Sequence, residues 1–226
     1  IELMPTAEFA GDYSWGYNPA YPFAVEEAYG GPDALKEFIK SAHEHGIGVI
    51  LDVVYNHFGP TDIDLWRFDG WSENEGGGIY FYNDDRADTP WGSTRPDYGR
   101  SEVVKYLRDN ALMWLEDFRM DGLRLDGTMF MRSRDGGYSH VDELDIPEAW
   151  DFFRELNNEI RSKYPDKLII AEDLQNRGDL TKPHFEGGGG FGSQWWAGFV
   201  HSIREAIITT NDSDRTLETI AGCLNI

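Results

Sequence analysis

Carboxylate, histidine and arginine side chains follow three apolar, strand-like runs, and together they suit the cleavage of a glycosidic bond. The runs end in the strings DVVYNH at residues 52–57, GLRLD at residues 122–126 and IIAED at residues 169–173. In a barrel of parallel strands, catalytic groups lie at the carboxyl ends of the strands. A retaining cleavage needs one carboxylate as nucleophile and a second carboxylic acid about 5–5.5 Å away. Asp126 and Glu172 are the candidates for these two catalytic roles.

Arg124 stands two residues before Asp126, so both side chains are expected on the same face of a strand. The guanidinium could then keep Asp126 ionised and oriented, as a nucleophile requires. Glu172 needs the opposite setting, because a general acid must stay protonated, in less polar surroundings and beside another carboxylate. An isolated R-x-D string is more often a plain ion pair at a strand end. The neighbouring strings are what favour a site here.

Alternating strand-like and helical segments would bring these side chains to one edge of a sheet. Apolar runs predict strands at residues 1–4, 47–54, 122–125, 168–171 and 191–195, and one-face periodicity predicts helices at residues 32–45, 101–118, 147–164 and 199–206. Pro32 and Pro147 are expected at helix starts, with Ser101 as a cap. This order predicts an α/β fold with a parallel sheet. An open doubly wound sheet also fits, but no G-x-G-x-x-G string opens a helix, which favours a (β/α)8 TIM barrel.

Residues 1–226 are expected to form one catalytic barrel domain that contains a long irregular segment; that this barrel is partial is what the family resemblance given below implies. Residues 58–100 are rich in Asp, Gly, Trp and Tyr and separate two predicted core strands. Long loops in compact domains usually carry function. We therefore expect this segment to shape the substrate cleft.

The composition excludes some partners and favours others. The chain has 226 residues and a formal net charge of -21, a field that repels nucleic-acid phosphates and anionic membrane surfaces. A neutral substrate is compatible with this charge. Cys223 is the single cysteine, so no intrachain disulfide can form, which favours the cytoplasm. The sequence has neither a secretory signal pattern nor an apolar run long enough to span a bilayer.

No metal or cofactor is expected. His43 and His45 are two residues apart near a helix end, without the cysteines or clustered acids of a zinc site. Asp62 and Asp64, with further aspartates at positions 84, 85 and 88, lack the spacing of a calcium-binding EF-hand loop. A Ser/His/Asp hydrolase is not indicated either, because the chain has no G-x-S-x-G string.

Taken together, the three strings and a GYNP string at residues 16–19 resemble the α-amylase family of retaining α-glucan-acting enzymes. The resemblance implies that Asp52 braces the arginine, that His57 hydrogen-bonds the sugar at the cleavage point, and that Asn56 supports it. It also implies that Tyr17 stacks under the same sugar, and that Tyr17, His57 and Arg124 bind substrate.

Within that family the chain resembles maltooligosyltrehalose trehalohydrolases and 1,4-α-glucan branching enzymes most closely. The strings that carry this resemblance are ELMPT at residues 2–6, WGY at residues 15–17, YGGP at residues 29–32, TPWG at residues 89–92 and AED at residues 171–173. The shared carboxylates leave both activities open, because water or a sugar hydroxyl can accept the glycosyl group. A non-catalytic carbohydrate-binding or scaffold fragment is the alternative.

The chain departs from the family pattern in two ways. The family's third carboxylate, carried by an Asn/Ser-His-Asp string, has no counterpart after Trp195, and only strands two to six of eight are recognised. We therefore expect a fragment or a processed chain, which would self-associate through open barrel edges that light scattering would detect. Gly127 and Thr128 follow the nucleophile where the family more often has a small apolar pair.

Overall fold

A computed structural model describes residues 1–59, 63–139, 141–175 and 177–224 of the chain. Five parallel strands form the main sheet in the order β1-β4-β5-β6-β7. Their bounds are β1 (Glu2–Leu3), β4 (Ile50–Val53), β5 (Gly122–Leu125), β6 (Leu168–Glu172) and β7 (Ser193–Trp195). The five predicted strands are therefore present and parallel, and the α/β prediction is confirmed.

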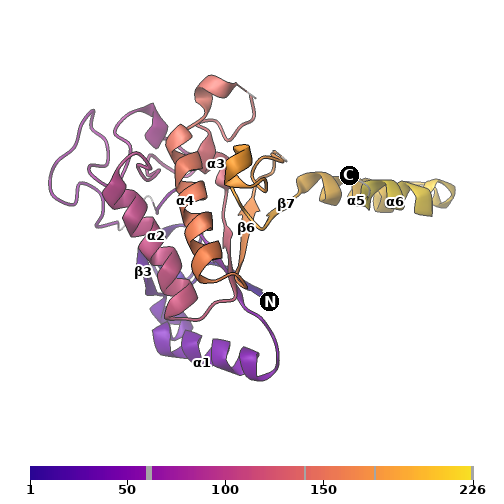
Figure 1. The fold of residues 1–226 in the computed structure, drawn as a ribbon, viewed down its shortest axis with the longest axis horizontal. Helices are drawn as coiled ribbons and strands as arrows, with labels where there is room; N and C mark the ends of the chain where they lie inside the picture. The colour runs from indigo at the N-terminus through magenta and orange to yellow at the C-terminus, as the bar shows by residue number, and fades with distance from the viewer. Residues whose placement is uncertain (60–62, 140, 176, 225–226) are drawn as a thin grey trace.

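Three amphipathic helices connect these strands. They are α1 (Gly31–Glu44), α2 (Ser101–Glu116) and α4 (Pro147–Lys163), and α2 and α4 lie side by side in Figure 1. Each helix buries one apolar stripe, as Leu35 and Ile39 do on α1, because residues three or four positions apart share a helix face. The carboxyl ends of the strands are thereby held in register beside one another.

The helix starts differ slightly from the sequence prediction. α1 begins one residue before Pro32. Ser101 was expected as a cap, but this prediction is wrong: it is the first helical residue, and Arg100 occupies the cap position without a side-chain cap bond. The Ser101 hydroxyl instead donates a hydrogen bond to Glu102 Oε2 at 3.0 Å.

Several elements were not predicted. An antiparallel hairpin of β2 (Ala7–Phe9) and β3 (Pro19–Val25) precedes α1, and the short helix α3 (Thr128–Arg132) follows β5 directly. Single-turn helices of the 3-10 type lie at Glu27–Tyr29, Asp85–Ala87, Asp142–Leu144, His184–Glu186 and Asp212–Asp214. Apart from β3, which has seven residues and contains Pro19 and Pro22, these elements are too short for their periodicity to be read from the sequence.

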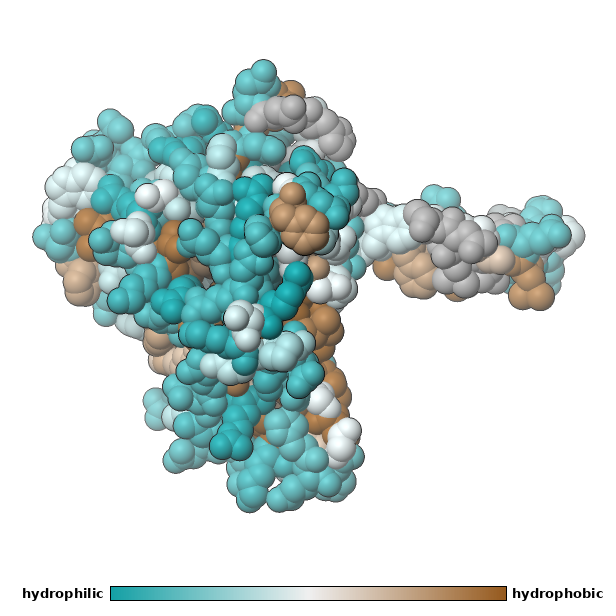
Figure 2. Space-filling view, viewed as in Figure 1, coloured by the Kyte–Doolittle hydropathy of each residue, from teal (hydrophilic) through white to brown (hydrophobic). Residues whose placement is uncertain are grey.

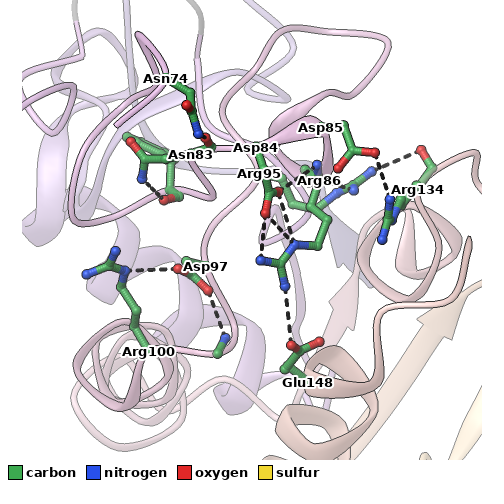
Figure 3. A network of polar contacts seen from close by, with 12 residues as sticks. Asn74, Asn83, Asp84, Asp85, Arg86, Arg95, Asp97, Arg100, Arg134 and Glu148 are labelled. Atoms are coloured by element: carbon green, nitrogen blue, oxygen red, sulfur yellow. Dashed lines mark hydrogen bonds and ion pairs between the residues drawn. The ribbon is translucent and has the colours of Figure 1, made fainter. Parts of the chain in front are cut away.

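The described residues within 58–100 form the long irregular segment that the composition indicated, and polar contacts hold them in place. Arg86 contacts Asp84 at 2.7 Å and Glu148 of α4 at 3.3 Å, while Asp85 contacts Arg134 at 2.7 Å (Figure 3). Residues 60–62 of this segment, including Asp62, lie outside the described residues. The ion pairs tie the segment to the helical layer beside the sheet.

Two helices, α5 (Ala197–Ile208) and α6 (Leu217–Leu224), follow β7 and project from the sheet as an arm (Figure 1). Figure 2 shows apolar residues along this arm, and Val200, Ile207 and Ile208 are exposed there. At the opposite edge of the sheet, Ile1 and Met4 beside β1 are also exposed. Self-association through the two sheet edges stays a prediction. Among the described residues, no helix is long and apolar enough to cross a membrane.

Candidate active site

The ends of β4, β5 and β6 bring the predicted residues to one place. Strand register sets Asp52 beside Arg124, and the Asp126 backbone N–H donates to the Val53 carbonyl at 2.9 Å. The Arg124 guanidinium contacts three carboxylates: Asp52 at 2.6 Å, Asp126 at 2.8 Å and Glu172 at 2.8 Å. Asp126 and Glu172 therefore meet at one arginine although 46 residues (172 − 126) separate them in sequence.

The pKa values of this cluster follow from burial and from an excess of negative charge. Burial raises the pKa of Glu172; the Arg124 guanidinium opposes this shift, and the neighbouring Asp126 adds to it. Burial likewise raises the pKa of Asp52 to about 7, against the influence of Arg124. Three carboxyl groups share one guanidinium, so the cluster retains a proton at a pH where isolated carboxyl groups are ionised. A group in that state can donate the proton.

Asn56 orients Asp126. Its side-chain N–H₂ donates to the Asp126 carbonyl oxygen and to Asp126 Oδ2, both at 2.8 Å. With Arg124 on Oδ1 at 2.8 Å, both carboxylate oxygens of Asp126 have a donor. The carboxylate is thereby fixed in one orientation at the end of β5, which is the arrangement a nucleophile needs.

His57 lies next to this cluster, but the structure buries it. Its Nδ1 is 2.5 Å from Asn56 Oδ1, its Nε2 is 3.2 Å from Asn18 Oδ1, and the residue is 1% exposed. The Trp91 ring stacks on the imidazole at 4.6 Å between ring centroids, with an interplanar angle of 15°. Burial lowers the His57 pKa to about 4, so the ring is neutral at neutral pH. A sugar that reaches His57 has to displace Trp91 or pack against it.

Tyr17 also lies at the site. Its hydroxyl donates to Asp52 Oδ2 at 2.7 Å, and burial is the main cause that raises the pKa of this phenol. The sequence predicted a stacking role for its ring, and that role stays a prediction. The hydroxyl contact instead links Tyr17 to the carboxylate that braces Arg124.

Trp195 is a site residue that sequence reasoning missed. It is paired in register with Glu172 at the end of β7, and its ring faces the Arg124 guanidinium at 4.2 Å. A hollow of about 510 Å³ opens beside it, lined by Leu174 and Phe199 among others. Position at the end of a predicted strand was the signal that could have found Trp195.

Among the residues that the structure describes, no group of three or more His, Cys, Asp or Glu side chains could hold a metal ion. His43 Nε2 instead lies 2.8 Å from Asp121 Oδ2, and His45 Nδ1 lies 2.8 Å from the Ser41 carbonyl oxygen. These contacts account for both histidines as parts of a helix end.

Comparison with known proteins gives concordant matches. The sequence model of the family described as "Alpha amylase, catalytic domain" matches residues 9–69 and 63–194. A crystal structure at 1.4 Å resolution of a candidate alpha amylase from Salmonella typhimurium has a TM-score of 0.68 and 29% sequence identity. It covers 91% of this chain, which covers 32% of that chain. The five-stranded sheet is thus part of a (β/α)8 barrel.

Two curated relatives carry the same description. A 1,4-alpha-glucan branching enzyme GlgB of Pseudoalteromonas atlantica is 38% identical over 89% of this chain and 28% of its own length. The GlgB protein of Oleidesulfovibrio alaskensis is 39% identical over 89% of this chain and 32% of its own length. The chain thus spans about a third of the length of these relatives. Since the family model matches most of its residues, the chain belongs to the alpha-amylase catalytic-domain family.

Proposed function

We propose that this chain is the catalytic barrel segment of a retaining enzyme that transfers or hydrolyses α-1,4-linked glucan chains, and that it is of the branching-enzyme type. The observation that carries the proposal is that Asp126 contacts Nη1 and Glu172 contacts Nη2 of one buried arginine, Arg124. The similarity to 1,4-alpha-glucan branching enzymes supports the choice of substrate.

In the first step Asp126 attacks the anomeric carbon. A bond forms between Asp126 and C1 while the bond from C1 to the glycosidic oxygen breaks, and the Glu172 proton moves to that oxygen. The raised pKa of Glu172 supports its role as the acid. Asn56 and Arg124 keep Asp126 oriented for the attack.

In the second step the Glu172 carboxylate acts as a base. It takes a proton from an acceptor hydroxyl, whose oxygen bonds to C1 as the bond between C1 and Asp126 breaks. A sugar hydroxyl as acceptor gives a branched glucan, whereas water gives hydrolysis of the kind a trehalohydrolase performs. Access to the cleft decides between them. The segment at residues 58–100 is proposed to control that access, because Trp91 belongs to it and lies on His57.

The proposed partner is a neutral α-glucan or maltooligosaccharide. The formal charge of -21 disfavours nucleic acid and anionic membranes, and the single cysteine favours the cytoplasm. No cofactor is part of the proposed reaction. A non-catalytic glucan-binding or scaffold role is the alternative, because Tyr17, His57 and Arg124 would serve binding in either case.

Product analysis tests the proposal. The assay uses the longest natural polypeptide that contains these residues, called the complete polypeptide below. It is incubated with amylose, a maltooligosaccharide and a glycosyltrehalose. New α-1,6 linkages from amylose are expected, and Asp126→Asn should abolish their formation while leaving glucan binding intact. Free trehalose from glycosyltrehalose would identify the hydrolase instead. Binding without turnover by the wild-type protein would favour the scaffold role.

A further inference from the structure

The backbone turns sharply after Asp126. Gly127 has φ of 52°, in the left-handed region, and α3 begins at the next residue. A Cβ atom on Gly127 would lie 2.8 Å from Asn56 Nδ2, the atom that holds Asp126. A glycine at this position therefore allows α3 to start directly behind the candidate nucleophile without disturbing it.

The same turn holds Glu172 from two sides. The Gly127 backbone N–H donates to Glu172 Oε2 at 2.8 Å. The Thr128 hydroxyl, which is fully buried, donates to the Glu172 carbonyl oxygen at 2.6 Å. The departure from the small apolar pair that is more frequent in the family thus supplies a hydroxyl contact that an apolar residue cannot make.

A buried ion pair makes the next link. Arg132, at the last position of α3, contacts Asp173 through Nε at 2.7 Å and through Nη2 at 3.2 Å. The two residues are 1% and 0% exposed. Asp173 directly follows Glu172, and its Oδ1 also accepts a hydrogen bond from the Gln175 N–H at 2.9 Å. The two parallel contacts fix the geometry of this pair. Loss of either partner would leave a buried charge without compensation.

We propose that α3 is a brace for the general acid: Thr128 and the Arg132–Asp173 pair are positioning residues that set where Glu172 delivers its proton relative to Asp126. This proposal rests on the proposed function. α3 follows Asp126 directly in the chain. Its first residue, Thr128, contacts Glu172, and its last residue, Arg132, contacts Asp173. A change in these contacts therefore moves the acid relative to the nucleophile.

The leaving group separates positioning of the acid from general structural support. A glycosidic oxygen needs a proton from Glu172 as it leaves, whereas fluoride leaves from a glycosyl fluoride as the anion without one. In that case the C1–F bond breaks as the bond between Asp126 and C1 forms. A misplaced acid therefore slows the first step with a maltooligosaccharide and spares it with α-maltosyl fluoride.

The test compares Thr128→Val and Asp173→Asn with the wild type in the complete polypeptide. Single-turnover cleavage of a maltooligosaccharide and the burst of fluoride from α-maltosyl fluoride are measured. We expect about 10- to 100-fold slower oligosaccharide cleavage, since a misplacement of about 1 Å can cost about 100-fold, and a fluoride burst within about threefold of wild type. Thr128→Ser, which keeps the hydroxyl, should restore oligosaccharide cleavage.

Glu159→Gln is the matched control, because Glu159 of α4 pairs with Arg108 of α2 in a similar two-contact geometry within the outer helical layer. It should change neither reaction. Equal losses on both substrates, or no loss on either, would overturn the proposal. Thr128→Val keeps the side-chain shape, so the test holds even where Asp173→Asn fails to fold. A wild-type fluoride burst no faster than that of Asp126→Asn would instead overturn the proposed function, and this proposal with it.

Discussion

Arg124 and Arg132 are both buried near the carboxyl ends of the strands, and their surroundings differ in charge. Arg124 is in contact with Asp52, Asp126 and Glu172, all within 2.8 Å. Arg132 has Asp173 as its close partner, and Asp145 is farther away at 3.9 Å and partly exposed. The first cluster has an excess of negative charge, whereas the second is close to neutral.

This difference supports the proposed roles of the two clusters, a reactive centre around Arg124 and a structural pair at Arg132. Around Arg124, burial together with competing carboxylates raises the pKa values of Glu172 and Asp52. A carboxyl group that still holds its proton can act as an acid. A neutral, two-contact pair such as Arg132–Asp173 supplies fixed geometry instead. Charge balance around these two buried arginines thus distinguishes the residues that are proposed to react from those that are proposed to hold them.

The largest expected effect comes from the acid. Glu172→Gln removes the proton donor but keeps the side-chain shape, so turnover of a maltooligosaccharide should fall by about 10²- to 10⁴-fold. Circular dichroism should show an intact fold, because Gly127 N–H can still donate to the amide oxygen. Steady-state kinetics of the complete polypeptide measure the loss. Turnover near the wild-type rate would show that the acid is misassigned and that the charge comparison does not identify it.

Much of this fold could be predicted from local signals. Short apolar runs identified all five strands of the sheet, and the prediction for Gly122–Leu125 has the bounds that the structure has. The positions of the strand ends then predicted which polar residues lie close together, because the carboxyl ends of parallel strands lie side by side. Asp52, Arg124, Asp126 and Glu172 accordingly lie in one cluster, as expected.

What could not be predicted depends on contacts between distant segments. The stacking of Trp91 on His57 could not be predicted from the sequence, because it depends on the path of an irregular segment rather than on periodicity. The brace from Thr128 to Glu172 and from Arg132 to Asp173 spans 44 and 41 positions. Its helix α3 has five residues, too few to show an apolar stripe.

The pH dependence of stability at Asp52 tests the excess of negative charge around Arg124. The expected effect is smaller than that of Glu172→Gln. Its pKa is raised from 3.8 to about 7, so the folded state binds the proton more tightly than the unfolded chain does. The stabilisation from this group is complete below about pH 4 and is lost as the pH rises toward 7. Asp52→Asn removes the titration, so the unfolding free energy of wild type relative to the variant should fall by about 1.4 kcal/mol per pH unit at most.

Urea unfolding of the complete polypeptide between pH 4.5 and 8, followed by tryptophan fluorescence, measures this slope. Replacing the protonated Asp52 carboxyl group with an amide shifts the variant by the same amount at every pH, so the slope is the informative quantity. A difference that stays flat between pH 4.5 and 8 would mean that Arg124 keeps Asp52 ionised throughout, because neither the folded nor the unfolded state would then bind a proton at this group. The two arginine regions would then differ less in charge than the structure implies.

Trp91 is expected to give the smallest change, because it covers the site without belonging to the charge cluster. Its indole stacks on His57 and meets Phe130 edge-on at 5.0 Å, so Trp91→Ala should admit water to the imidazole. The His57 pKa should then rise from about 4 toward its usual value of 6.5, because burial is what lowers it. An NMR titration of the histidine ring reports this, and kcat/KM should change by about tenfold or less.

Trp71→Ala is the control, since Trp71 lies on the same segment but contacts Arg100 at 5.0 Å. An unchanged His57 pKa in Trp91→Ala would mean that the neighbouring asparagines, rather than the indole, keep water from this part of the site.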